Sequence, residues 1–188
     1  MNKLPWVEVV PRLDDLDKTF YGLERGIIPI NMPLMCVHTL NDPTRAPEGK
    51  HTLWVYQFEP YHLKDGGPAR WDKIKEEVAD SVLETIREYT TNMGPENILG
   101  RWICSPLDWE RWNPTLKEGD THQIGQSQAQ WMLNRPLSGW IHWRTPVKKL
   151  YMSGASTLPG ASVTGGGRLT VQVIMEDLGI DFNKVIAK

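Results

Sequence analysis

Residues 151–168 read Y-M-S-G-A-S-T-L-P-G-A-S-V-T-G-G-G-R and carry the strongest local signal in the chain. A short apolar run ending at Met152 leads into small residues, a Pro-Gly pair and three consecutive glycines. An apolar-periodic stretch follows, so the order predicts a buried strand over 149–153, a tight turn and a helix over 167–178. Backbone N–H groups at the start of such a helix can be offered to an anion or to a ring carbonyl.

Two upstream segments predict an antiparallel sheet. Residues 33–40 (P-L-M-C-V-H-T-L) and residues 51–58 are rich in β-forming residues, and the turn-rich stretch 41–49 separates them. We expect the two strands to be antiparallel neighbours. A weaker pattern indicates a further strand over 98–104.

The clearest helix is predicted over 68–93. Its apolar residues recur at three- and four-residue spacing, and Gly-Pro pairs bracket it. A short helix is expected to begin after Ser105, its candidate N-cap, and residues 181–188 indicate a last helical turn or two. Residues 1–28 predict a helix or an arm that packs on a partner. The polar stretch 113–130 predicts a loop across a functional face.

The composition indicates an ordinary soluble protein with a real core. The chain has 188 residues, 40% of them hydrophobic, and a net charge of −2. Such a charge argues against a nucleic-acid partner or an anionic membrane surface. No apolar run approaches the roughly 20 residues that span a bilayer, so we expect no transmembrane segment and a cytoplasmic location. Cys36 and Cys104 lack metal-type spacing and are expected to be reduced, buried thiols.

Nine tryptophans are the compositional outlier. We expect Trp54 and Trp71 in the core. Trp131, Trp140 and Trp143 approach the glycine-rich segment in sequence, and for them a pocket or an interface between chains is as plausible as the core.

The 151–168 stretch resembles the C-terminal flavin-binding segment of the phytoene dehydrogenase-related FAD oxidoreductases, which include carotenoid desaturases and amine oxidase-like enzymes. The typical pattern there is G-A-S-T-H-P-G-G-G-V-T-G-A-P-G-R. Residues 43–61, 119–140 and 144–151 look like further stretches of that family, in family order. The G-x-G-x-x-G fingerprint of a dinucleotide-binding domain is absent from the sequence. The resemblance therefore implies the C-terminal half of such a flavoenzyme, carried as a separate subunit.

The fold implied by this resemblance is α+β. It combines an antiparallel substrate-domain sheet under a helical cover with a C-terminal strand-turn-helix that completes a partner chain's FAD-binding domain. Residues 1–28 would be an N-terminal arm, residues 29–148 a substrate-binding-type domain and residues 149–188 the flavin-binding segment. The partner would supply the Rossmann-type FAD-binding subunit.

The resemblance also implies which residues lie along the flavin. Backbone N–H groups around Val163 and Thr164 would face the pyrimidine carbonyl end of the ring, and the stretch from Gly154 to Ser156 would lie beside the ribityl chain and phosphate. A helix N-terminus stabilises the negative charge of reduced flavin by roughly 0.3–2 kcal/mol. The full candidate FAD-binding set is Gly154, Ala155, Ser156, Ser162, Val163, Thr164 and Gly165.

The sequence departs from the family pattern at three positions. Leu158 stands where the family has His, and Ala161 and Ser162 replace two glycines. An acid–base role for that His cannot be carried over, so the catalytic residues stay unknown. Trp131 and Met132, together with Leu158, are the candidate contacts for an apolar substrate.

Other polar residues suggest no chemistry of their own. His122 and His142 have no Asp, Glu or Cys at ligand spacing, so no metal site is expected. Arg135 and Arg144 are expected to anchor turns rather than to clamp a substrate. No Gly-x-Ser-x-Gly elbow surrounds Ser127, so a hydrolase has no support.

The leading hypothesis is a subunit of a split FAD-dependent oxidoreductase, active only with a partner chain that carries the G-x-G-x-x-G domain. It would dehydrogenate or desaturate an apolar, isoprenoid-like small molecule by hydride transfer to flavin. One alternative is a C-terminal fragment of a single-chain flavoenzyme. The other is a non-catalytic scaffold or hydrophobic-ligand-binding subunit with the same fold.

Overall fold

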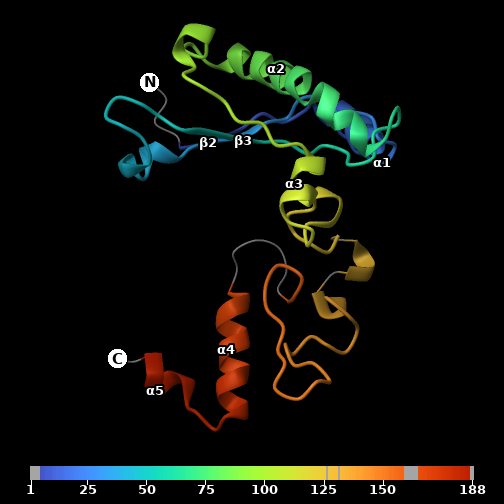
Figure 1. Cartoon of the computed structure of the whole chain (residues 1–188), viewed down its shortest axis with the longest axis vertical. Helices are drawn as coiled ribbons and strands as arrows, with labels where there is room; N and C mark the ends of the chain where they lie inside the picture. The colour runs from blue at the N-terminus through green and yellow to red at the C-terminus, as the bar shows by residue number, and fades with distance from the viewer. Residues whose placement is uncertain (1–4, 126, 131, 159–164, 187–188) are drawn as a thin grey trace. The chain divides into compact units, whose positions relative to one another are not determined.

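A computed structural model of the chain describes residues 5–125, 127–130, 132–158 and 165–186 (Figure 1). The chain divides into two compact units, Met1–Asp108 and Trp109–Lys188, which are described in turn. The functional division expected from the sequence, at residues 28/29 and 148/149, stays a prediction.

The first unit is built on a three-stranded antiparallel sheet. Strands β1 (Trp6–Glu8), β2 (Leu34–Val37) and β3 (Leu53–Tyr56) lie in the order β1-β2-β3. The two predicted strands are confirmed in shortened form, because β2 passes directly into a 3-10 turn, His38–Leu40. Strand β1 was not predicted, since three residues are too few to show an alternating pattern.

Helix α2 (Trp71–Tyr89) packs on one face of the sheet over β1 and β2, and it confirms the predicted long helix (Figure 1). Met35 of β2 forms a buried cluster with Val82 and Ile86 of α2. Trp71 is buried in a second cluster, as expected, and its indole N–H donates to the Pro60 carbonyl oxygen at 3.0 Å. The sheet and its helical cover confirm the predicted α+β class.

The opposite face of the sheet carries a row of aromatic side chains, which we call the aromatic face. Trp6 and Trp54 flank Cys36 in register, with their ring centroids 6.1 Å apart. Trp54 stacks on Tyr56 at 5.6 Å, and Tyr56 meets Phe58 edge-on at 5.4 Å. The expectation that Trp54 lies in the core was wrong, because its side chain points away from α2 and stays exposed.

Two further helices belong wholly or partly to the first unit. Helix α1 (Leu13–Glu24) lies within the N-terminal stretch expected to form a helix or an arm. Helix α3 (Pro106–Trp112) begins after Ser105, as predicted. The Asp108 amide donates to the Ser105 hydroxyl oxygen at 3.2 Å, and the Ser105 amide donates to the Asp108 carboxylate at 3.0 Å. These reciprocal bonds form a capping box.

The second unit ends in helices α4 (Gly166–Asp177) and α5 (Phe182–Ile186), both predicted. Gly179 has a φ of 70°, in the left-handed region, and follows the end of α4 as expected. Residues 113–125 and 127–130 form a loop with short 3-10 turns at Lys117–Gly119 and Gln128–Gln130.

Two predicted strands are corrected. Residues 149–153 form only an isolated bridge between Tyr151 and Arg144, and Lys149 has a φ of 65°, which extended backbone does not allow. Residues 98–104 form no strand either. Arg101 in this stretch is paired with Asp80 and Glu76 of α2, so the segment is tied to the helix rather than to the sheet.

None of the helices described in the structure could cross a membrane. Each of them is either too short or too polar to span the apolar interior of a bilayer.

Candidate functional site

The segment expected to contact flavin begins with a tight turn at Gly154. Gly154 has a φ of 110°, and its carbonyl oxygen accepts bonds from the Thr157 amide at 3.1 Å and the Thr157 hydroxyl at 2.8 Å. Thr157 is buried, whereas Gly154 is exposed. A Cβ placed on Gly154 would meet no atom of the described residues within 4 Å, its chain neighbours apart. The hydrogen bonds of the buried Thr157 therefore hold the turn, while Gly154 itself is exposed to solvent.

Arg135 fastens this turn to the polar loop. Its side chain is only 2% exposed, and its guanidinium donates solely to backbone carbonyl oxygens among its described hydrogen bonds. The shortest bond, 2.8 Å, reaches Ile124. The accepting residues are His122, Ile124, Gly125, Gln130 and Ala155. Arg135 is thus an anchor for turns, as the sequence predicted.

Two more hydrogen bonds hold the segment. The Ser156 hydroxyl donates to the Gln123 side-chain oxygen at 3.0 Å, and the Trp143 indole N–H donates to the Leu158 carbonyl oxygen at 3.0 Å. Trp143 therefore lies against the candidate flavin segment. The Leu158 side chain is half-buried.

The start of the segment lies next to the first turn of α4. The buried Thr170 hydroxyl is 3.0 Å from the Met152 carbonyl oxygen and 2.9 Å from that of Gly166. Gly165 at the N-cap provides no side-chain cap, and a Cβ on Gly165 or Gly167 would meet no atom within 4 Å among the described residues other than its chain neighbours and the helix backbone. A glycine-lined helix start suits close approach by a ligand with negative charge.

The structure does not describe all of the predicted site residues. Ser162, Val163, Thr164 and Trp131 lie outside the described residues. Met132 begins a short 3-10 helix, Met132–Asn134. The structure therefore brings together the 152–158 segment and the N-terminal end of α4.

An exposed cluster of polar and charged side chains links the C-terminal end of α4 to Arg144 and Tyr151. Arg144 makes a two-pronged pair with Asp177, with its shortest contact at 2.8 Å, and also pairs with Glu176 at 2.8 Å. The Tyr151 hydroxyl donates to Asp177 at 2.8 Å. Hydrogen bonds from Arg144 and then Tyr151 hold the pKa of Asp177 below its ordinary value. The side chain of Arg144 thus links residue 144 to helix α4, whereas the sequence had predicted that it anchors a turn.

The histidines show no ligand cluster. His122 Nδ1 lies 3.6 Å from Asp120 Oδ1, and the His122 carbonyl oxygen is held by Arg135. Within the part of the chain that the structure describes, no group of three His, Cys, Asp or Glu residues could hold a metal ion.

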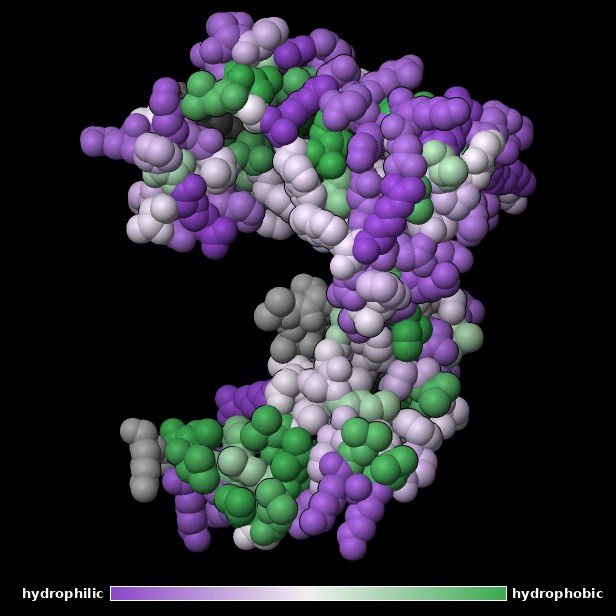
Figure 2. All heavy atoms as spheres, viewed as in Figure 1, coloured by the Kyte–Doolittle hydropathy of each residue, from purple (hydrophilic) through white to green (hydrophobic). Residues whose placement is uncertain are grey.

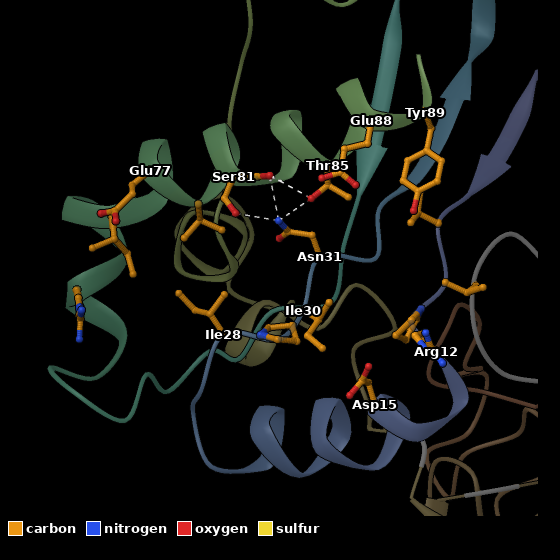
Figure 3. Close-up of a pocket in the computed structure, with 17 residues that line it drawn as sticks. Arg12, Asp15, Ile28, Ile30, Asn31, Glu77, Ser81, Thr85, Glu88 and Tyr89 are labelled. Atoms are coloured by element: carbon orange, nitrogen blue, oxygen red, sulfur yellow. Dashed lines mark hydrogen bonds between the residues drawn. The ribbon is translucent and has the colours of Figure 1, made fainter. Parts of the chain in front are cut away.

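The first unit has a groove of about 730 Å³ between α1, α2 and residues 28–31 (Figure 3). Asn31 points toward α2, where its amide donates to the Ser81 hydroxyl at 2.8 Å and the Thr85 hydroxyl at 3.0 Å. Arg12, which precedes α1, and Asp15 of α1 lie on the other side (Figure 3). No sequence pattern pointed to this groove, because its lining comes from segments far apart in the chain.

Glu59 is a buried carboxyl group that sequence reasoning also missed. Gln57 donates to its Oε1 atom at 2.7 Å, while its Oε2 atom is buried without a hydrogen-bond partner among the described residues. Burial raises the pKa of Glu59 to about 7, against the smaller opposing effect of the Gln57 bond. Gln57 also accepts a hydrogen bond from the Met32 amide at 2.9 Å. The Glu59 carboxyl therefore neighbours a hydrogen bond that links Met32 to Gln57.

The second unit exposes an apolar surface over α4 and α5, which we call the α4–α5 patch (Figure 2). Leu178 alone is 63% exposed. The patch comprises Val171, Leu178, Ile180, Val185 and Ile186. Exposed aliphatic side chains grouped in this way are typical of surfaces that contact another protein.

Comparison with known proteins identifies relatives of this chain. Pyridine nucleotide-disulfide oxidoreductase domain-containing protein 2 of Rattus norvegicus is 33% identical over 159 residues, which are 82% of this chain and 27% of that protein. A limonene dehydrogenase subunit of Castellaniella defragrans is 26% identical over 173 residues, 89% of this chain and 31% of the relative. The neurosporene-forming phytoene desaturase of Cereibacter sphaeroides is 30% identical over 128 residues, 68% of this chain and 23% of the enzyme.

No protein-family model matches the chain, and no solved structure matches it significantly. The chain spans about a quarter of the length of its relatives, 27% for the rat protein. The matches nevertheless extend over most of this chain, and the names of all three relatives describe oxidoreductases or parts of them. The chain therefore belongs to the family of oxidoreductases that is related to the phytoene desaturases.

Proposed function

We propose that the chain is one subunit of a split FAD-dependent oxidoreductase and that it contributes one wall of the flavin site. The observation that carries this proposal is the 152–158 segment, held by hydrogen bonds from Arg135 and Thr170 beside the glycine-lined start of α4. The open backbone at Gly154 and Gly165 fits a flat ligand that must approach closely.

The chain's own groups would bind and orient the cofactor. The positive end of the α4 dipole would stabilise negative charge on the ring by roughly 0.3–2 kcal/mol. The Gly154–Ser156 backbone would lie along the ribityl chain, and Ser162, Val163 and Thr164 would complete the wall. Bound FAD would supply the acceptor for the hydride removed from a substrate carbon.

The partner would be a separate chain with the Rossmann-type FAD-binding domain. The sequence has no G-x-G-x-x-G, and the chain covers only 27% of the rat relative. One relative is itself named as a subunit, that of limonene dehydrogenase. The exposed α4–α5 patch would be covered in the complex.

The substrate would be an apolar, isoprenoid-like molecule that the enzyme dehydrogenates or desaturates in the cytoplasm. Two relatives, the phytoene desaturase and the limonene dehydrogenase subunit, support an apolar substrate through their names. Trp131, Met132 and Leu158 stay the candidate contacts from the sequence. The aromatic face of the first unit, with Trp6 and Trp54 exposed, is a further apolar surface suited to such a molecule.

The experiment is to tag the chain in its source organism, purify it under native conditions and record the visible spectrum. Every co-purifying chain is then identified by mass. We expect the spectrum of an oxidised flavin and one stoichiometric partner with a G-x-G-x-x-G motif. Purified chain without flavin and without a partner would overturn the proposal. A single polypeptide containing both halves would instead establish the fragment alternative.

A non-catalytic scaffold is favoured by one observation, the apolar Leu158 at the position of the family's His. Leu158 is held through its backbone carbonyl by Trp143, so its side chain can be exchanged without losing that bond. The variant Leu158→His should alter the rate of flavin reduction in the complex if the site is catalytic. An unchanged rate, together with no turnover of apolar substrates, would support the scaffold.

A further inference from the structure

Strand β3 lies at an edge of the sheet. Strand β2 is central, β1 and β3 flank it, and no described strand pairs with the outer edge of β3. An edge strand presents unpaired backbone N–H and C=O groups, which another extended segment can pair with. Proteins usually protect such edges with charged residues, proline or short strand length.

The two edges of this sheet differ in that protection. Both edge strands are short, but β1 follows Pro5 and ends with the charged Glu8. Strand β3 reads L-W-V-Y over Leu53–Tyr56 and contains neither charge nor proline. The protected edge is therefore β1, and the unprotected edge is β3.

Within the described part of the chain, strand β3 is also partly exposed on both faces of the sheet. Leu53, Trp54 and Val55 are 37%, 40% and 38% exposed. Val55 is the register partner of Met35, yet Met35 is only 6% exposed because α2 packs over it. The cover of α2 thus stops short of β3, and three successive large apolar side chains stay in contact with water.

We propose that β3 is the docking edge for an extended segment of the partner chain, which adds a fourth strand to the sheet. This inference rests on the proposed split oxidoreductase. The occupant is assigned to the partner because the relatives contain far more chain than the 27% that this sequence matches in the rat protein. Strand addition combines main-chain hydrogen bonds with apolar side-chain contacts, and β3 offers both.

The docking segment should be extended and apolar. An apolar strand laid beside Leu53–Tyr56 would meet no charged side chain from β3. Cross-strand pairs between aromatic and β-branched residues are favourable, so Trp54 and Val55 suit such a neighbour. A second copy of this chain could pair through the same edge, and the test below separates it from the partner.

The experiment uses the natural complex and the full chain alone. Hydrogen–deuterium exchange compares the amides of residues 53–56 in the two samples, and binding is measured with the purified flavin-containing partner chain. The variants Leu53→Lys and Val55→Lys place a charge on the edge. The matched control is Leu99→Lys, which changes a leucine that is 78% exposed elsewhere in the same unit. Thermal melting confirms that each variant is folded.

We expect slower exchange at residues 53–56 in the complex and at least tenfold weaker partner binding by both edge variants, with Leu99→Lys unchanged. If the complex carries flavin but these amides exchange as in the free chain, the edge inference fails while the proposed function stands. A homodimer that either edge variant dissociates would show that a second copy occupies β3 and would overturn the inference. A chain isolated without flavin, partner or dimer would overturn both proposals. If an edge variant does not fold, exchange in the wild-type samples decides alone.

Discussion

The guanidinium of Arg135 donates two hydrogen bonds to the carbonyl oxygen of Ala155, at 3.2 Å from Nε and 3.1 Å from Nη2. The same group also holds carbonyl oxygens of the preceding loop, including that of Ile124 at 2.8 Å. One buried side chain thus sets the position of the candidate flavin segment relative to the loop. A planar fork of five N–H donors is what such an arrangement requires.

Replacing Arg135 by Met should unfold much of the second unit. The change leaves several carbonyl oxygens without donors, and we expect a loss of about 3 kcal/mol in unfolding free energy. Arg135→Lys should recover little of it, because an ammonium cannot span the same set of oxygens. Urea unfolding and limited proteolysis of residues 113–158 measure the effect. Lys148→Met, at an exposed site, is the control, and equal stability of Arg135→Met and this control would contradict the prediction.

The buried carboxyl of Glu59 predicts a pH-dependent stability. Its folded pKa is raised to about 7 from an ordinary value of 4.5. Below pH 4.5 both states hold the proton, and between pH 4.5 and 7 only the folded state does. Stability should therefore fall as the pH rises through this window, by up to roughly 3 kcal/mol.

The variant Glu59→Gln should remove this dependence, because a neutral amide replaces the carboxyl without the cost of buried charge. Urea unfolding at pH 5 and pH 8 should then show a larger difference for the wild type than for the variant. The exposed Glu48→Gln serves as the matched control and should behave like the wild type. A wild-type stability that rises between pH 5 and 8 and a variant with the same slope would refute the assignment.

The capping box at the start of α3 predicts a smaller effect. Ser105→Ala removes the acceptor for the Asp108 amide and the donor to its carboxylate, so the free energy of unfolding should fall by about 1 kcal/mol. Ser127→Ala, at an exposed position, controls for the loss of a hydroxyl. Indistinguishable urea midpoints for the two variants would show that the cap contributes nothing.

Local patterns predicted most helices and the two longer strands. The apolar periodicity of residues 68–93 predicted α2, and Ser105 predicted the start of α3. Both predictions succeeded because each pattern lies within the helix that it indicates or directly before it. Strand β1 and the exposed position of Trp54 depend on which strands pair and which face α2 covers, and no local pattern carries that information. The sequence shows that aromatic residues alternate along β3, but it does not show on which face of the sheet they lie.

The sequence indicated the segments of the candidate site, but not the hydrogen bonds that hold them in place. The glycines pointed to an open backbone at Gly154 and Gly165, and Arg135 was expected to anchor turns. The partners of Arg135 are carbonyl oxygens, which every residue has, so they leave no trace in the sequence. The strand expected at 149–153 failed for a related reason, since a strand needs a neighbour to pair with and here only Arg144 lies opposite Tyr151.

The bond from the Trp143 indole to the Leu158 carbonyl oxygen predicts an effect on the cofactor rather than on the fold. Trp143→Phe keeps an aromatic ring but removes the donor, so the end of the flavin segment should become less ordered. A loss of about 1 kcal/mol corresponds to roughly fivefold weaker flavin binding by the complex, measured by titration of the apo-complex with FAD. Trp140→Phe makes the same chemical change at a neighbouring tryptophan and should leave binding unaltered. If both variants weaken binding equally, the Trp143 bond has no specific role in holding the segment.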